Sequence, residues 1–178
     1  MHMQIDRLTP ENFQFYGDVI DAQNAATHYL INKGTTTRFH DLAKVDIVSD
    51  DVNPANVGIS IFRGDARVFP LRISMLERHP LGSQAFMPLN QKPYLIVVAP
   101  SLDEHRPDIH KMKVFWAKAS QGVNYACGTW HHPLIALGDA ADFLVIDRIG
   151  SGHNCDEYEF DEAFVYQIDE TDFARFSS

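Results

Sequence analysis

Two short stretches of this sequence combine side chains that can hold a metal ion or move a proton. In LERHPLGSQAFMP (residues 76–88), Glu77 and His79 lie two positions apart, and Gln84 follows five positions after His79. The preceding residues alternate as in a strand, and side chains two apart on a strand point to one face of the sheet. Imidazole, carboxylate and amide oxygen are ligands of divalent transition metals, with imidazole suiting nickel, zinc, copper or iron. This stretch therefore predicts a metal site or an acid–base site.

The second stretch, GTWHHPL (residues 128–134), contains two adjacent histidines. Adjacent side chains on a strand point to opposite faces, so we expect only one of them to reach the site directly, and we favour His131. An isolated histidine more often packs in the interior and hydrogen-bonds locally, which is the alternative for His132. Two separate stretches that both supply ligand side chains favour a shared site.

The elements that must position these residues are short strands. Apolar runs of four to six residues recur along the chain and are separated by turn-forming glycine, proline, asparagine and aspartate. Such a pattern predicts an all-β barrel or sandwich, whereas a parallel α/β fold is disfavoured because long amphipathic helices are missing. Thr9-Pro10-Glu11 predicts one short N-terminal helix that ends near Tyr16. The strands that we expect cover residues 29–31, 58–63, 71–79, 84–88, 94–99, 114–117, 134–137 and 143–148. The run at 94–99 is apolar throughout, as in a strand buried on both faces.

Length and composition limit the possible classes of protein. A chain of 178 residues fits a single domain covering 1–178. The formal net charge of −9 argues against non-specific nucleic-acid binding, which needs a basic face. The N-terminus lacks the apolar core of a secretory signal, and no stretch approaches the roughly 18 apolar residues of a membrane span, so we expect a cytoplasmic protein without membrane contact. We expect Cys127 and Cys155 to be reduced thiols.

The two stretches at residues 76–88 and 128–134 resemble the two short motifs of the cupin superfamily, whose members are small jelly-roll barrels. Glu77, His79 and Gln84 occupy the positions of the histidine, histidine and glutamate in the first cupin motif, and Gly128 and His131 match the glycine and histidine of the second. The sequence departs from the first motif at three places. Glu77 replaces a histidine, Gln84 replaces the usual glutamate, and the closing glycine is Gln91. A neutral amide is a weaker metal ligand than a carboxylate, so these departures argue against tight metal binding.

More specifically, nearly the whole chain resembles the ureidoglycolate lyase family of allantoin degradation. The segments that carry this resemblance are RFHDLA (38–43), LERHPLGSQAFMP (76–88), QGVNYACGTWHHPL (121–134), FLVIDR (143–148) and NCD (154–156). The resemblance implies a homodimeric cytoplasmic enzyme that splits (S)-ureidoglycolate into glyoxylate and urea. It also implies nickel or another divalent metal as cofactor, and catalysis without metal is left open.

This reaction requires a base and an acid, because the substrate hydroxyl loses a proton while the departing urea nitrogen gains one. Without a metal, Glu77 or His79 would be the base. With a metal, Glu77, His79, Gln84 and His131 would be its ligands, and His132 or Tyr125 would donate the proton.

The substrate also has a carboxylate and a ureido group to be bound. Arginine pairs with carboxylates through two parallel hydrogen bonds, which makes Arg63 and Arg72 the candidate anchors. Arg63 ranks first, because Arg72 alternates out of phase with the apolar Ile73. Asn124 is the candidate donor to the ureido carbonyl.

Two other functions fit the same residues. One is an amidohydrolase that acts on the same substrate and releases ammonia, which product analysis would distinguish. The other is a non-catalytic cupin that binds a small anion without turnover.

Overall fold

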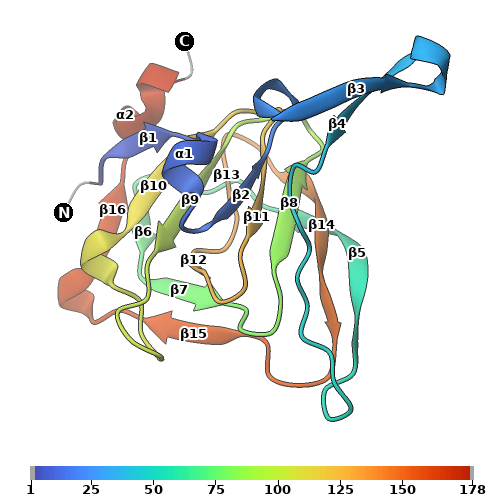
Figure 1. Ribbon diagram of the computed structural model, residues 1–178. Helices are drawn as coiled ribbons and strands as arrows, with labels where there is room; N and C mark the ends of the chain where they lie inside the picture. The colour runs from blue at the N-terminus through green and yellow to red at the C-terminus, as the bar shows by residue number, and fades with distance from the viewer. Residues whose placement is uncertain (1–2, 177–178) are drawn as a thin grey trace.

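The computed structural model describes residues 3–176, and most of its regular structure is β-strand (Figure 1). The strands are β1 (Ile5–Arg7), β2 (Gly17–Ile20), β3 (Thr27–Ile31), β4 (Thr36–His40), β5 (Ala55–Gly64), β6 (Leu71–Ile73), β7 (Met75–Arg78), β8 (Gln84–Pro88), β9 (Tyr94–Ala99), β10 (Lys113–Ala117), β11 (Gly122–Tyr125), β12 (Trp130–His131), β13 (Ile135–Ala136), β14 (Ala141–Gly150), β15 (Asp156–Glu159) and β16 (Tyr166–Ile168). The helical segments are α1 (Pro10–Phe13), α2 (Glu170–Phe173) and the 3-10 turns η1 (Ala22–Asn24), η2 (Asn32–Gly34), η3 (Ile109–Lys111), η4 (Glu162–Phe164) and η5 (Ala174–Phe176). Across residues 3–176, no helix has the length and apolar character needed to cross a membrane.

Two sheets face each other and form the body of the protein. One has the strand order β1-β10-β9-β12-β7-β15, with β13 also paired to β9, and the other has the order β2-β11-β8-β14-β5. The strand pairs in these sheets are antiparallel except for β1 with β10. This all-β, cupin-like arrangement confirms the predicted fold class.

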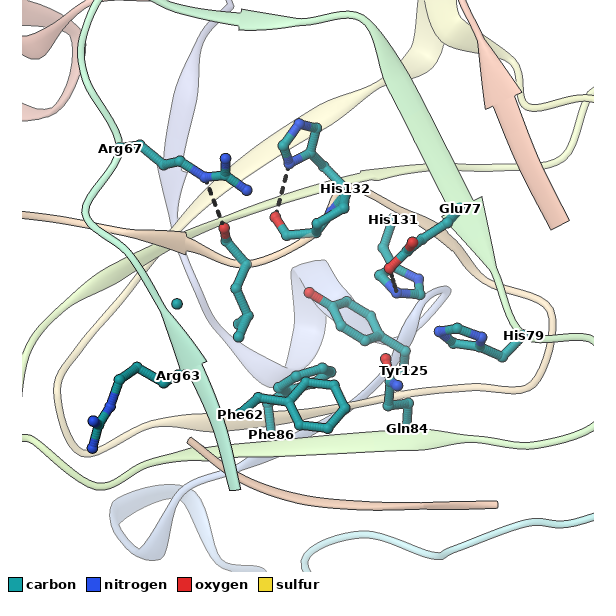
Figure 2. Close-up of a pocket in the computed structure, with 13 residues that line it drawn as sticks. Phe62, Arg63, Arg67, Glu77, His79, Gln84, Phe86, Tyr125, His131 and His132 are labelled. Atoms are coloured by element: carbon teal, nitrogen blue, oxygen red, sulfur yellow. Dashed lines mark hydrogen bonds and ion pairs between the residues drawn. The ribbon is translucent and has the colours of Figure 1, made fainter. Parts of the chain in front are cut away.

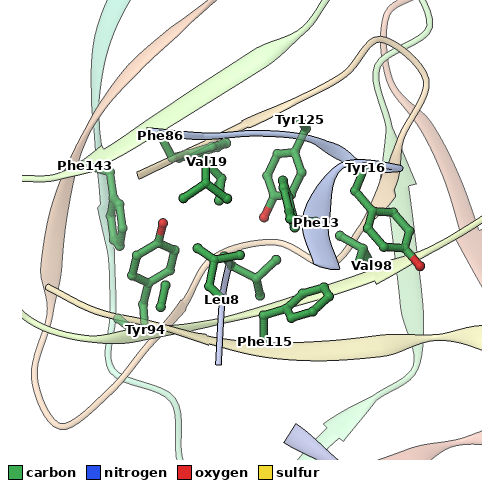
Figure 3. Packing of buried hydrophobic residues seen from close by; sticks show 14 of the residues in the cluster. Leu8, Phe13, Tyr16, Val19, Phe86, Tyr94, Val98, Phe115, Tyr125 and Phe143 are labelled. Carbon is green, nitrogen blue, oxygen red and sulfur yellow. The ribbon is translucent and has the colours of Figure 1, made fainter. Parts of the chain in front are cut away.

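Aromatic side chains fill the space between the two sheets (Figure 3). Tyr94 on β9 and Phe143 on β14 meet edge to face across this space, with ring centroids 5.1 Å apart. Strand β9 alternates between this core and a second one on its other side, where β6, β16 and the C-terminal helical segment cover the sheet. All six of its residues are buried, which confirms the prediction for residues 94–99.

The N-terminal helix α1 is a single turn. Thr9 accepts a hydrogen bond from the backbone of Asn12, the Asn12 side chain accepts one from Thr9, and Pro10 occupies the first helical position. The helix ends at Phe13, earlier than the expected end near Tyr16, and Phe13 is fully buried against the inner core.

The predicted strand 71–79 is in fact two strands that belong to different sheets. Strand β6 pairs only with β16, whereas β7 lies between β12 and β15. Ser74 separates them, and its carbonyl accepts a hydrogen bond from the backbone of Phe160. The alternation before Ser74 therefore does not predict which way the side chains of β7 point.

Strands β3 and β4 form a hairpin that projects from the body, here called the arm (residues 27–40; Figure 1). Its strands pair only with each other. The arm exposes Tyr29, Leu30 and Phe39. Cys127 and Cys155 are both free thiols, as the sequence predicts.

Candidate active site

A cavity of about 470 Å³ opens between the ends of the two sheets, within the usual size range of small-molecule sites. It combines a polar cluster with an aromatic and apolar wall. The residues that line it are Phe62, Arg63, Gly64, Arg67, Glu77, His79, Gln84, Phe86, Tyr125, His131, His132, Pro133 and Leu134.

The polar cluster is formed by Glu77, His79 and His131. Strands β7 and β12 place Glu77 and His131 directly opposite each other, and His79 follows the end of β7. The potential ligand atoms of the three side chains all lie within 4.8 Å of one another. Glu77 Oε1 lies 3.6 Å from Nε2 of His131. The two stretches that suggested a shared site in the sequence are thus adjacent in the fold (Figure 2).

The hydrogen bonds of the two histidines fix which ring nitrogen faces the cluster. Nδ1 of His79 lies 2.6 Å from the carbonyl oxygen of Asn154, and Nδ1 of His131 lies 2.9 Å from that of Thr129. A carbonyl oxygen only accepts, so Nδ1 donates in both rings and each neutral ring keeps a lone pair on Nε2. Both Nε2 atoms are buried, and neither has a hydrogen-bond partner among residues 3–176.

These bare nitrogens fit a metal ion. Ligating histidines usually bind the metal through one nitrogen and donate the other N–H to a carbonyl or carboxylate. His79 and His131 have this arrangement, and the carboxylate of Glu77 supplies a charged oxygen beside them. Two imidazoles and one carboxylate suit a divalent transition metal.

Gln84 lines the same cavity from β8. Its Nε2 donates to Asp147 on β14 at 3.2 Å, so its carbonyl oxygen is the atom that remains to act as an acceptor or ligand. Gln84 is also the cross-strand partner of Tyr125 on β11.

Tyr125 lies against the cluster and closes its inner side. Its ring stacks on the ring of His131 with centroids 4.2 Å apart and planes 11° apart. Figure 2 shows the hydroxyl directed into the cavity, on the side toward Arg67. Burial raises the pKa of the Tyr125 hydroxyl, and the nearby Glu77 raises it further, so the group is a protonated donor at neutral pH.

Burial also changes the acid–base properties of the other polar groups. It raises the pKa of the Glu77 carboxyl, although the neighbouring His79 opposes this. It lowers the pKa of His131 to about 3 and that of His132 to about 4, so both imidazoles are neutral at pH 7. His132 Nδ1 lies 2.8 Å from the carbonyl of Pro133, and Figure 2 shows its ring turned away from the Glu77–His79–His131 cluster.

The structure does not place the predicted substrate-binding residues in the cavity as expected. Arg72 lies exposed on β6, outside the cavity, because the strand containing it is separate from β7. Asn124 lies on the opposite face of β11 from Tyr125, where its amide donates to Asp18 and to the carbonyl of Lys44. Arg63 reaches the rim, but its guanidinium points away (Figure 2) and binds Asp142 through two hydrogen bonds.

Arg67 and the aromatic wall were not predicted from the sequence. Arg67 lies in the loop between β5 and β6, where no periodic pattern predicts the direction of a side chain. Phe62 and Phe86 meet edge to face at 5.9 Å and form part of the wall. The alternation of β5 could not have identified Phe62, because in the sequence the apolar face is that of Ile59 and Ile61, which the structure shows to be exposed.

Comparisons with known proteins give a consistent result. Residues 1–167 match the model of the family described as ureidoglycolate lyase. The chain is 49% identical over 161 residues to the ureidoglycolate lyase of Burkholderia mallei, which covers 90% of this chain and 91% of that protein. It is 48% identical over 163 residues to ureidoglycolate lyase 1 of Rhizobium meliloti, covering 92% of each. It is 49% identical over 160 residues to the ureidoglycolate lyase of Pseudomonas fluorescens, covering 90% and 92%. With a family match over nearly its full length and relatives at this level of identity, the chain belongs to the ureidoglycolate lyase family.

Proposed function

We propose that this chain is a ureidoglycolate lyase that splits ureidoglycolate into glyoxylate and urea. The observation that carries the proposal is the convergence of Glu77, His79 and His131 in one cavity, where the ring of Tyr125 stacks on His131. Family membership supports the choice of reaction.

The reaction needs two proton transfers at one carbon. In ureidoglycolate this carbon carries a hydroxyl, a carboxylate and the urea nitrogen. When the hydroxyl loses its proton, its oxygen forms the aldehyde of glyoxylate and the C–N bond breaks. The urea nitrogen keeps the bonding electron pair and takes up a proton. A proton acceptor near the hydroxyl and a donor near the nitrogen are therefore sufficient to balance the reaction.

Glu77 is the proposed acceptor and Tyr125 the proposed donor. The carboxylate of Glu77 faces the cavity beside His131. Tyr125 presents a protonated hydroxyl to the same space. His132 is the weaker candidate donor, because its Nδ1–H is already engaged with the Pro133 carbonyl and its Nε2 holds a lone pair.

A divalent metal ion, for which nickel is the first candidate, would be held by Glu77, His79 and His131, with the carbonyl oxygen of Gln84 as a fourth ligand. Such an ion would supply Lewis-acid chemistry that lowers the pKa of the substrate hydroxyl. Glu77 has two carboxylate oxygens, so one can hold the ion while the other accepts a proton.

The aromatic wall restricts the access of water. Phe62 and Phe86 line the cavity opposite the polar cluster. A drier cavity strengthens each polar interaction with the substrate.

The test is a product assay on chelator-treated protein, with and without added nickel, that measures urea, glyoxylate and ammonia. We expect urea and glyoxylate in equal amounts, and their loss in Glu77→Gln and His79→Ala. His105→Gln is the matched control, because His105 is exposed and outside the cavity. Ammonia without urea would identify an amidohydrolase, and an absence of product from the nickel-loaded protein would identify a binding protein. Full activity in His79→Ala would refute the site.

We also propose that the protein acts as a cytoplasmic homodimer, as the family resemblance implies. The arm supports subunit contact, because it exposes Tyr29, Leu30 and Phe39, and an isolated two-stranded hairpin is only marginally stable in water. Sedimentation equilibrium of the wild type and of Leu30→Glu would measure this association, and a wild type that sediments as a monomer at all concentrations would contradict it.

A further inference from the structure

Arg67 is a cationic residue of the cavity lining that neither holds the proposed metal ion nor transfers a proton. Arg67 lies at the rim, near His132 (Figure 2). Within residues 3–176, no carboxylate forms an ion pair with Arg67. An arginine that borders a small-molecule cavity without an anionic partner is suited to bind an anion there.

Two contacts with the following segment fix the position of Arg67. Its backbone N–H donates to the carbonyl of Ala136 at 3.1 Å, and its side-chain Nε donates to the carbonyl of Leu134 at 3.2 Å. These bonds use Nε and leave the two terminal nitrogens. Figure 2 shows these nitrogens beyond the Leu134 contact, on the side of His132. The two terminal nitrogens of a guanidinium form a planar fork that matches the two oxygens of a carboxylate.

We propose that Arg67 is the residue that binds the substrate carboxylate, with its terminal nitrogens donating to the two carboxylate oxygens. This inference rests on the proposed function. The carboxylate then lies at the rim, and the carbon that carries the hydroxyl and the urea nitrogen is directed inward, toward Tyr125 and Glu77. Arg67 thereby selects substrates that have a carboxylate next to the reacting carbon.

Arg63 provides the contrast, because it borders the same cavity with the same chemistry. Its Nε and Nη2 hold Asp142 at 2.7 and 2.9 Å, and its side chain is 72% exposed. Its fork is thus occupied by a carboxylate of the protein itself. Arg63→Gln is therefore a matched control that removes an arginine from the rim without removing the proposed anchor.

The test compares the binding of glycolate and glycolamide to the nickel-loaded protein by calorimetry. Glycolate has the carboxylate and hydroxyl of the substrate, and glycolamide replaces the carboxylate with a neutral amide. Arg67→Gln should weaken glycolate binding by roughly 10- to 100-fold, which is the range expected for hydrogen bonds to a charged group. It should leave glycolamide binding nearly unchanged, so the preference for the anion disappears.

Further variants separate anion binding from structural support. Arg67→Lys should restore part of the preference, because it keeps the charge but loses the fork, and Arg63→Gln should bind both probes as the wild type does. An Arg67→Gln protein that melts as the wild type and keeps its preference for glycolate would overturn the assignment. Equal losses for both probes would also overturn it.

Binding and turnover are measured separately. If the wild type releases no urea but its glycolate binding depends on Arg67, the proposed function fails and the anion site stands. If urea is released and the KM of Arg67→Gln equals that of the wild type, the proposed function stands and the role of Arg67 fails.

Discussion

Replacing Tyr125 by phenylalanine tests the proposed proton donor with the smallest possible change. The substitution removes one hydroxyl and keeps the ring, which stacks on His131 at 4.2 Å and contacts the rings of Phe13 and Phe86. No described residue forms a hydrogen bond with the hydroxyl, so its loss leaves no protein donor or acceptor unpaired. We therefore expect the unfolding free energy to change by less than about 1 kcal/mol.

The expected effect on the rate is much larger. A positioned general acid contributes about 10²- to 10⁴-fold, which corresponds to roughly 2.7–5.4 kcal/mol of activation free energy. The hydroxyl would act on the departing nitrogen as the C–N bond breaks, so the loss should fall on kcat with little change in KM.

The assay is the steady-state release of urea by nickel-loaded wild type and Tyr125→Phe, together with the thermal unfolding of both. Tyr16→Phe is the matched control, because Tyr16 belongs to the same core but does not line the cavity. Figure 3 shows its hydroxyl pointing away from the core. If Tyr125→Phe turns over at the wild-type rate, Tyr125 is not the donor. A large fall in kcat for Tyr16→Phe would show that the effect is not specific to the cavity.

Three other predictions follow from the metal cluster, an ion pair and the inner core. Nickel added after chelation should stabilise the wild type by about 2.7 kcal/mol at 100 times its Kd, seen as a rise in Tm, and His131→Gln should lose most of this rise. The hydrogen bond from Arg78 lowers the pKa of Asp156 in the folded protein. The ionised Asp156 therefore stabilises the fold above its unfolded pKa of about 3.9, and this stabilisation is lost as the pH falls through the lowered pKa of the folded state. In urea titrations, Asp156→Asn should therefore cost about 1 kcal/mol at pH 7, since the pair is partly exposed, and the difference should vanish in acid; a constant difference would contradict this. Phe143→Ala should cost about 3–5 kcal/mol by chemical denaturation because Phe143 is fully buried, whereas Phe15→Ala should change little because Phe15 is 86% exposed.

Strand periodicity predicted the strand that carries Glu77, as part of residues 71–79, but it predicted neither β12, which carries His131, nor all of the side-chain directions. Glu77 and His131 could be identified because each lies in a strand with a distinct motif, and the register of β7 with β12 brings them together. The prediction for Asn124 was inconsistent with the alternation of side chains along a strand. It is adjacent to Tyr125 on β11, so the two side chains point to opposite faces and only one of them can reach the cavity. The same rule that allowed only one of His131 and His132 would have excluded one member of this pair.

Local sequence patterns cannot determine which arginine reaches the cavity. Arg72 was a candidate because of its side-chain chemistry and ranked second because it alternates out of phase with Ile73; its strand ends before Ser74, where the chain leaves one sheet for another. Arg67 lies in a loop, and its position depends on hydrogen bonds with Leu134 and Ala136, which are far away in the sequence. No local pattern contains this pairing, so only the folded chain distinguishes Arg67 from the other arginines.

For His79 and His131, the folded structure favours the interpretation as metal ligands over the interpretation as packed core residues. From sequence, a single histidine is more often a packed side chain that satisfies its own hydrogen bonds. His79 and His131 satisfy only half of this description, because Nδ1 donates to a carbonyl while Nε2 is buried without a partner. A buried polar atom without a partner lowers the folding stability by about 1–3 kcal/mol. Two such atoms beside one carboxylate would therefore destabilise a core that had only a structural role. A bound ion offsets this cost, so the bare nitrogens favour a ligand role for both histidines.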